Sequence, residues 1–517
     1  MKILSAIKAF TAASLIGSGL VSCTDWLKVD MTDQVMENTL FSSYSGYRAA
    51  LNSIYQHMND IYTTHLGAGA IDVMAQYYYV TENDNHTMRM YSGYKYNDAA
   101  FESINSTIWS SLYTLLANTN ALLEHTSDDN GVLTESQRGL LRGEALALRA
   151  FFHFDVLRLY GPIYSQEPDK VCIPYQGTSR REVQPLLPAG EILGYIIRDL
   201  KEAESLLHEY DPILTDGVGN VIMVDDGTSA YDTSYRQIRF NYFAVETMLA
   251  RAYLWKGDNA EAYRYAKGVI SNQHTPDGNL IFPWAKREDV QAENPDNIFS
   301  TEVIFALYNS RRLAALNNAF FTSTLSRSSR LTFFGSSLTG DSKVASFYDD
   351  PNDLRRKMWE IVEPTEAEIK DAIANNTVAT NSLAFNKYIN PAGDAASTTK
   401  ATTYRYMIPL IRLSEVYLIA AEATTDESEA FELINTVRRN RECSNVTVES
   451  GLDRALTYEM AREVIGEGQL FYFYKRRAMQ EIISGTSAST PYTISLNNYV
   501  LPIPESELEQ RVLVSGN

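Results

Sequence analysis

Helical periodicity is the feature of this sequence that most constrains its fold. Apolar residues recur at spacings of three, four and seven over residues 102–125, as they do in an amphipathic helix. A second periodic run follows Thr134, has Gln137 in the capping-box position, and ends at Gly161. A third occupies residues 188–212 and ends in Asp-Pro. These runs predict an all-α protein.

Two stretches predict pairs of antiparallel helices. Residues 241–272 read as helix, glycine turn and helix, with small and large apolar residues close to the tetratricopeptide pattern. Residues 412–441 repeat this arrangement more weakly. Such pairs need neighbours to bury their apolar faces. Because the chain of 517 residues exceeds the roughly 250–300 at which single cores stop growing, we expect several domains or an extended helical array.

Long polar insertions separate the predicted helix pairs. Each exceeds the roughly 12–15 residues usual for a structureless loop, so each is expected to be functional or to carry local structure. A helical scaffold with large loops on one side is a common way to build a binding surface. The insertions are residues 165–188, 211–238, 271–300, 310–345 and 390–404.

The N-terminus has the layout of an export signal. Lys2 and Lys8 precede an uncharged, largely apolar run that is too short to span a bilayer as a helix. The run ends in Leu-Val-Ser-Cys, which resembles the lipobox of bacterial lipoproteins. This resemblance implies a signal peptide over residues 1–22 and a lipid on Cys23, and Thr24 after it implies the outer membrane. The alternative is a plain secretory signal with an incidental cysteine.

Charge excludes one class of partner. Removing residues 1–22 takes two lysines from a chain of formal net charge −19, which leaves −21. So acidic a protein repels phosphate backbones, and because no basic run is present we expect no nucleic-acid binding. The remaining cysteines, Cys172 and Cys443, are interpreted either as a disulfide or as two inert core thiols.

Motifs for catalysis are absent from the sequence. It contains no Gly-x-Ser-x-Gly elbow, His-Glu-x-x-His, Gly-rich phosphate loop or Cys-x-x-Cys, and its seven histidines have no ligand spacing. We therefore expect no enzyme activity, no cofactor and no metal site.

An aromatic-rich stretch, residues 71–98, is the best candidate for binding sugars. Aromatic faces stack on sugar C–H surfaces, and neighbouring amides, carboxylates and guanidiniums bond hydroxyls. The alternative is that these tyrosines form a half-buried strand or pack on the scaffold, and that a loop tryptophan plugs a local core. The ligand-binding candidates are Tyr77, Tyr78, Tyr79, Asn83, Asp84, Asn85, Arg89, Tyr91, Tyr94, Tyr96 and, in a separate loop, Trp284.

Five stretches, in order along the chain, resemble the SusD/RagB family of Bacteroidetes outer-membrane lipoproteins. The first is Cys23 followed by "WLKVD", and the last pairs "EMAREVIGEGQLFYFYKRR" with "YVLPIPESELE". Between them lie three helical motifs. Their matching residues are Trp109, Tyr113 and Asn120; Glu144, Arg149, Ala150, Phe151, Gly161 and Pro162; and Arg412, Glu415, Leu418, Ala421 and Glu422.

The resemblance implies a single SusD-like domain over residues 23–517, all-α, with tetratricopeptide-like helix pairs and long loop insertions. Members sit on the cell surface over a SusC-like TonB-dependent transporter and capture glycans, or sometimes peptides, for import. In the family, the segment between the first two helix pairs contributes ligand contacts.

The stretch "LFYFYKRR" departs from the commoner Arg-Trp-Phe-Asp-Leu of the family, which indicates a subfamily and leaves the ligand class open. A peptide-binding member, a glycan-cleaving surface lipoprotein and an assembly or adhesion scaffold remain alternatives. Arg149, Arg412 and Glu415 stand among apolar scaffold helices, so we expect them to form ion pairs between helices.

Overall fold

The computed structural model describes residues 31–81, 85–180, 182–219, 234–389 and 403–515. The chain divides into two compact units, residues 1–49 and 50–517. The first contains α2 (Met31–Leu40), and α3 (Tyr44–Tyr62) begins in the first unit and continues into the second. The predicted signal peptide and Cys23 lie outside the described residues and stay predictions, as does the single domain over residues 23–517.

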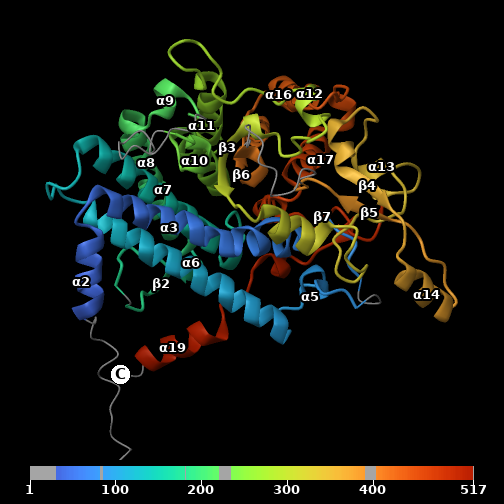
Figure 1. Cartoon of the computed structure of the whole chain (residues 1–517), viewed down its shortest axis with the longest axis horizontal. Coiled ribbons are helices and arrows are strands. Elements are labelled where there is room, and N and C mark those ends of the chain that lie inside the picture. The colour runs from blue at the N-terminus through green and yellow to red at the C-terminus, as the bar shows by residue number, and fades with distance from the viewer. Residues whose placement is uncertain (1–30, 82–84, 181, 220–233, 390–402, 516–517) are drawn as a thin grey trace, which may run out of the picture. The chain divides into compact units, whose positions relative to one another are not determined.

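The long helices predicted from periodicity are present in the second unit. They are α6 (Ala99–His125), α7 (Glu135–Tyr160) and α8 (Ala189–Tyr210), and α7 packs against both of the others (Figure 1). The capping box forms as predicted at the start of α7. The backbone N–H of Gln137 donates to the Thr134 hydroxyl over 3.2 Å, and the Gln137 side chain accepts from the Thr134 N–H over 3.0 Å.

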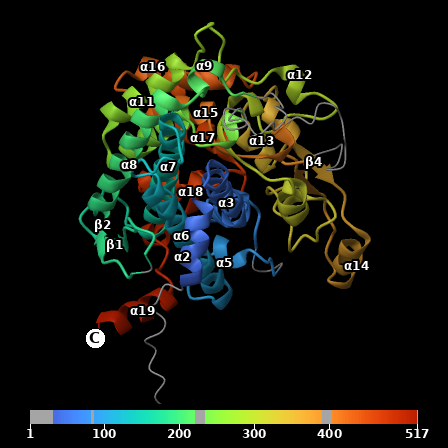
Figure 2. The same cartoon turned by 60° about the vertical axis from the view of Figure 1, so that its left-hand side comes forward.

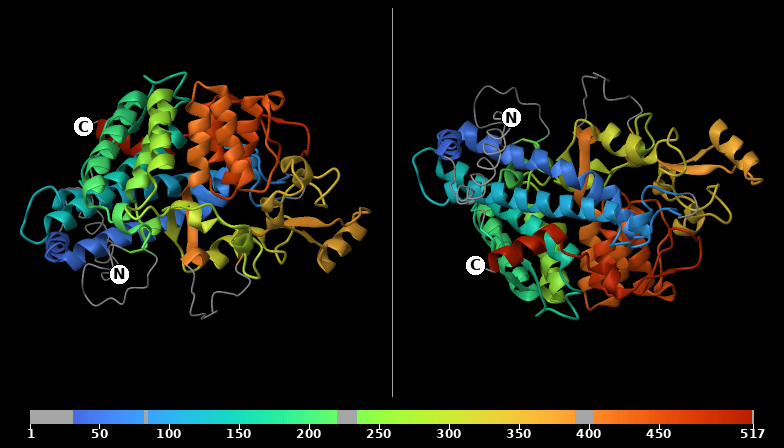
Figure 3. Two further views of the ribbon diagram at one scale, coloured as in Figure 1. Left: turned by 90° about the horizontal axis from the view of Figure 1, so that it is seen from above. Right: turned by 90° about the horizontal axis from the view of Figure 1, so that it is seen from below.

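The predicted helix pairs also form. α10 (Tyr242–Lys256) and α11 (Asn259–Asn272) are joined through Gly257, whose φ of 84° gives the left-handed turn that favours glycine. α15 (Leu413–Ala423) and α16 (Glu427–Arg439) repeat the arrangement. α8 packs on α10 and α11 packs on α15, so the pairs lie side by side as one array, seen from above in Figure 3. This arrangement confirms the predicted all-α class.

Strands in the described residues occur only as antiparallel pairs. β3 (Val303–Tyr308) pairs with β6 (Met407–Arg412), which leads directly into α15. Arg412, the last residue of β6, belongs to the family motif that continues into α15. The strand depends on a partner about a hundred residues earlier in the chain, which no local pattern indicates. The other pairs are β1 (Val171–Pro174) with β2 (Leu186–Pro188), β4 (Trp359–Val362) with β5 (Ser382–Phe385), and β7 (Glu481–Ile482) with β8 (Tyr492–Thr493).

The long insertions carry short elements of their own, as expected, except that residues 390–402 lie outside the described part. α14 (Glu366–Ala374) stands away from the helix pairs in Figures 1 and 2.

None of the described helices is both long and apolar enough to cross a membrane. The remaining helices are α4 (Ala70–Met74), α5 (Arg89–Ser92), α9 (Ile213–Asp216), α12 (Arg287–Val290), α13 (Lys343–Phe347), α17 (Leu452–Val464), α18 (Leu470–Arg476) and α19 (Glu505–Ser515). The 3₁₀ and π turns are η2 (Thr64–Ala68), η4 (Arg236–Ile238), η5 (Ser300–Glu302), η6 (Leu313–Phe321), η7 (Leu354–Met358), η8 (Thr403–Tyr406), η9 (Val448–Ser450) and η10 (Leu496–Tyr499).

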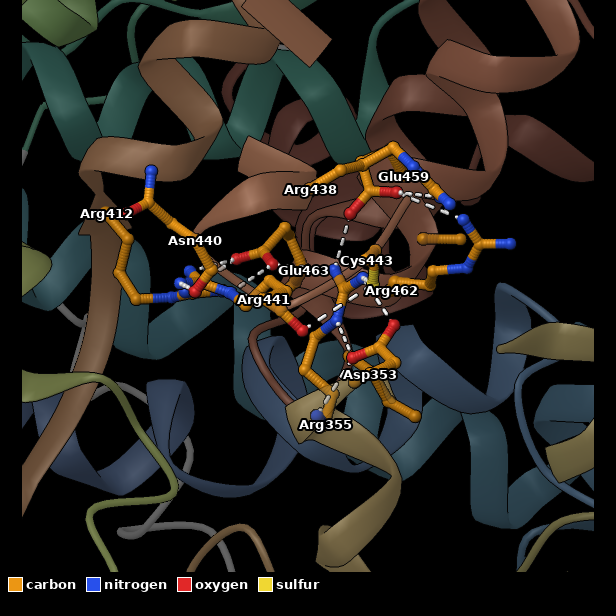
Figure 4. A network of polar contacts seen from close by, with 12 residues as sticks. Asp353, Arg355, Arg412, Arg438, Asn440, Arg441, Cys443, Glu459, Arg462 and Glu463 are labelled. Carbon is orange, nitrogen blue, oxygen red and sulfur yellow. Dashed lines mark hydrogen bonds and ion pairs between the residues drawn. The ribbon is translucent and has the colours of Figure 1, made fainter. Parts of the chain in front are cut away.

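A buried ionic network fixes α17 in the second unit (Figure 4). Glu463 accepts from Arg355 (2.7 Å), Arg412 (2.9 Å) and Arg441 (2.8 Å). One turn earlier, Glu459 accepts from Arg355 (2.6 Å) and from two further arginines on α16 and α17. Burial alone would raise the pKa of the Glu463 carboxyl, but the three guanidiniums hold it well below its ordinary value. Each buried charge is thus compensated by partners of opposite sign.

The predicted ion pairs between helices are confirmed. Arg149 on α7 binds Asp199 on α8 over 2.7 Å. Glu415 on α15 binds Arg251 on α10 over 2.5 Å. Together with Arg412, these residues belong to the scaffold.

The two described cysteines, Cys172 and Cys443, are free and buried. They do not pair, so the inert-thiol interpretation holds. Burial raises the pKa of the Cys172 thiol to about 11, which keeps the sulfur protonated and unreactive.

Candidate functional site

The tyrosine run that follows α4 divides between the core and the surface. Tyr77 and Tyr78 are buried, with 0% and 2% of their surfaces exposed. The Tyr77 hydroxyl donates to the Ala461 carbonyl over 2.6 Å, and the Tyr78 ring lies 5.9 Å from that of Phe321. These two rings pack in the core, so a ligand cannot stack on either ring unless the core opens.

The three later tyrosines also pack inside the protein. Tyr91 is buried against Phe101, 5.7 Å between ring centroids. Tyr94 is buried and donates to the Met74 carbonyl over 2.6 Å. Tyr96 is half-buried, its ring lies tilted at 4.7 Å from that of Phe101, and its hydroxyl donates to the Asn498 carbonyl. These contacts match the alternative interpretation, in which the tyrosines pack on the scaffold.

Tyr79 keeps part of its ring at the surface. Its backbone N–H donates to the Thr332 carbonyl over 2.7 Å, which ties this segment to a stretch about 250 residues later. That stretch places the Phe334 ring 5.6 Å from the Tyr79 ring and the Arg327 guanidinium 5.8 Å from it. Both neighbours are half-buried. An aromatic pair and a guanidinium therefore meet at one place on the surface.

The loop after Tyr79 runs along the same later stretch. The Thr87 N–H donates to the Ser328 carbonyl over 2.9 Å. In this loop Asn85 is exposed and Arg89 is half-buried. We call Tyr79, Arg327 and Phe334 the Tyr79 face; Asn85 and Arg89 follow in the segment that Thr87 ties to Ser328. Of the other loop candidates, Asn83 and Asp84 lie outside the described residues.

Trp284 is not brought into contact with the Tyr79 face. It is half-buried, its ring lies 5.2 Å from that of Tyr417, and the Arg441 guanidinium sits 5.5 Å from it. Because Arg441 also binds Glu463, Trp284 covers one side of the buried ionic network. This placement matches the interpretation of a loop tryptophan that plugs a local core.

The Tyr79 face has the chemistry of a binding surface. The rings offer flat apolar area, and the guanidinium group donates to oxygen acceptors. Among the described residues no group of three or more His, Cys, Asp or Glu is placed to hold a metal ion. Arg327 and Phe334 were missed in the sequence because they stand in a polar insertion with no motif, and only the fold brings them to Tyr79.

The protein is an array of helix pairs whose loops bring half-buried aromatic rings beside guanidinium groups. This arrangement is that of a helical scaffold with a binding surface built from loops. Comparison with known families places the chain more closely. A family model described as SusD-like, starch-binding and associating with the outer membrane matches residues 25–218, and the SusD family model matches residues 360–514. The chain belongs to the SusD/RagB family. No curated protein matches it.

Solved structures share the fold over most of the chain. A SusD superfamily protein from Bacteroides thetaiotaomicron has a TM-score of 0.66 at 20% identity, covering 90% of this chain and 98% of its own. A SusD-like carbohydrate binding protein from Bacteroides vulgatus gives 0.63 at 16% identity, covering 90% and 96%. A laminarin binding SusD-like protein gives 0.57 at 17% identity, covering 90% and 98%. These likenesses confirm the predicted SusD-like fold.

Proposed function

We propose that this protein captures a glycan at the cell surface and passes it to a SusC-like TonB-dependent transporter. The observation that carries the proposal is the Tyr79 face, where Tyr79 and Phe334 meet beside Arg327 in a chain of the SusD/RagB family. The family's description as starch-binding and the name of the laminarin-binding neighbour support a glycan as the cargo.

The chemistry of capture is non-covalent. A sugar ring stacks its C–H face on Tyr79 or Phe334, and Arg327, Arg89 and Asn85 donate to its hydroxyl oxygens. Because the cargo must be released to a pore, a dissociation constant between about 1 µM and 1 mM serves the purpose. Selectivity then comes from which hydroxyls face the donors.

The test is direct binding. The purified chain is run through gels loaded with laminarin, amylopectin or other polysaccharides, and the affinity is measured by calorimetry, with peptides as a separate set. We expect one glycan class to bind without being cleaved. Tyr79→Ala should weaken it about tenfold, because one stacking face is worth on the order of 1 kcal/mol.

The matched control is Tyr308→Ala, which removes another exposed tyrosine, on β3. Equal binding by Tyr79→Ala and the parent chain would remove the Tyr79 face from the proposal. If peptides bind and glycans do not, the proposed ligand class changes from glycan to peptide. If the glycan is cleaved, the protein is an enzyme.

Hand-over requires anchoring and a partner. We propose that Cys23 carries the lipid and that the anchored protein sits on a SusC-like barrel at the outer membrane. Affinity-tagged protein isolated from native outer membranes should bring a large β-barrel protein with it, identified by mass spectrometry. Cys23→Ser should leave the protein outside the membrane fraction. Recovery of the wild-type chain without any barrel protein would contradict the transporter partner.

A further inference from the structure

A cavity lies in the same unit as the Tyr79 face. It has a volume of about 560 Å³ and is bounded by α13, the first half of α17 and the loop of residues 483–491. This loop joins the paired strands β7 and β8. The volume falls in the range of roughly 300–1,000 Å³ usual for small-ligand pockets. We call it the α17 cavity.

The loop is seated closely on the segment that carries the tyrosine run. The Ser346 hydroxyl of α13 donates to the Ala488 carbonyl over 2.8 Å. A Cβ on Gly485 would lie 2.1 Å from the Tyr78 carbonyl oxygen, so only glycine fits there. From the other side, the Tyr77 hydroxyl bonds the Ala461 carbonyl of α17. The buried tyrosines therefore hold two walls of the cavity together.

The walls of the cavity are rich in hydroxyl groups. Thr457 lines the cavity, but its own hydroxyl oxygen is shielded from it. The Ser487 hydroxyl oxygen accepts from the N–H groups of Ser489 (3.3 Å) and Thr490 (3.0 Å), which leaves its own O–H to donate. Ser484 lines the cavity as well. Hydroxyl groups of this kind both donate to and accept from the hydroxyls of a sugar.

One aromatic ring stands among these hydroxyls. Tyr458 is half-buried, with the guanidiniums of Arg454 and Arg462 at 5.3 Å and 5.7 Å from its ring. Arg462 is held in place by its ion pair with Glu459 of the ionic network. The side of the Tyr458 ring that faces Arg462 is therefore fixed. The ring is thus a rigid platform on the cavity wall.

Four charged residues line the cavity: Lys343 and Asp453 are engaged within the protein, and Arg454 and Glu481 add one cation and one anion that balance in charge. Lys343 is buried and donates to the carbonyls of Gln76 (3.0 Å) and Tyr77, and Asp453 is ion-paired with Arg477. Exposed Glu481 lies at the rim, where a carboxylate accepts from hydroxyls. This balance of charge favours an uncharged ligand over an anion, since Lys343 already bonds two carbonyls.

We propose that the α17 cavity binds an uncharged pyranose unit of a glycan, with Tyr458 as the stacking platform and the hydroxyls of Ser484 and Ser487 as its hydrogen-bonding partners. The inference rests on the proposed function and assigns a second subsite to it. The rigid platform, the hydroxyl-lined walls and the loop seated by Gly485 are the features that carry it.

The test follows hydrogen exchange of the purified full chain with and without laminarin, and separately with amylopectin. Bound glycan should slow exchange in residues 452–458 and 483–491, because it covers the two walls. Tyr458→Ala should weaken calorimetric binding about tenfold. Tyr458→Phe keeps the ring and should bind within about twofold of the parent, as should the matched control Tyr308→Ala.

The outcomes separate this inference from the proposed function. One outcome overturns the cavity site and leaves the proposed function standing. In it, glycan slows exchange only in residues 79–89 and 326–334, and Tyr458→Ala binds with full affinity. Binding lost in Tyr458→Ala but kept in Tyr79→Ala supports the cavity and removes the Tyr79 face. Absence of binding by the parent chain to laminarin, amylopectin and every other polysaccharide in the gels overturns both.

Discussion

At the scale of single residues, Lys475 shows how an unusual side chain is accommodated. It lies in the stretch that departs from the commoner family sequence, and it is fully buried. Its ammonium group donates to the carbonyls of Arg158 (2.7 Å), Leu159 (3.3 Å) and Gly161 (2.7 Å) at the end of α7. Burial lowers its pKa well below the ordinary value. The Arg158 and Gly161 carbonyls receive a donor at the helix end in this way, while the Leu159 carbonyl also accepts from the Leu501 N–H over 3.1 Å.

Replacing Lys475 with Met should therefore destabilise the protein by about 3 kcal/mol. The substitution keeps the bulk but leaves buried carbonyls without donors, each worth about 1–3 kcal/mol. The measurement is the free energy of unfolding in urea. The control is Lys256→Met at the exposed end of α10, where a change within about 0.5 kcal/mol is expected. Equal unfolding free energies for the two variants would contradict this account of Lys475.

Neighbouring residues also mark the limit of what sequence predicts about the site. Tyr77, Tyr78 and Tyr79 are chemically identical and consecutive, yet two are core residues and one is half-exposed. Composition identifies a segment suited to sugars, but exposure depends on which side of the turned backbone each ring occupies. Phe334 and Arg327 complete the face through contacts about 250 residues apart, and no local pattern reports such contacts.

At the scale of elements, helices were predictable because their signals are local. The Thr134 cap and the Gly257 turn each lie within a few residues of the ends they define, and both are observed. The strand β6 was not predictable, since its identity depends on pairing with β3. α17 shows a third case: the family resemblance covers part of it, while its buried Glu459 and Glu463 are explained by arginines that come mostly from other elements.

At the scale of the whole molecule, buried carboxylates make folding sensitive to acid. The pKa values of Glu422, Glu459 and Glu463 are lowered, as burial is outweighed by adjacent arginines. A carboxyl whose pKa is lower in the folded chain than in the unfolded one binds fewer protons when folded. Its stabilisation is complete above the unfolded pKa, about 4.3, and is lost as pH falls through the folded value.

We therefore expect the contribution of these three carboxyls to the unfolding free energy to be constant from pH 7 to about pH 5 and to fall below it. Glu463→Gln should lower stability at pH 7 by about 3 kcal/mol, because it leaves one surplus positive charge in the buried network although each arginine keeps another carboxylate, and should flatten the fall in acid. Denaturant titrations across pH measure both effects. Glu432→Gln, which breaks an exposed pair with Arg439, should change stability by less than about 1 kcal/mol. An unchanged acid slope in Glu463→Gln would contradict the assignment.

The loop of residues 483–491 has a consequence for how such proteins diversify. It spans two short strands and touches the helices through Ser346 and the close approach of Gly485. Its exposed positions, such as Ser489 and Thr490, take no part in helix packing. Substitutions can therefore accumulate in this short segment, and alter the lining of the α17 cavity, while the ion-paired helices behind it stay unchanged.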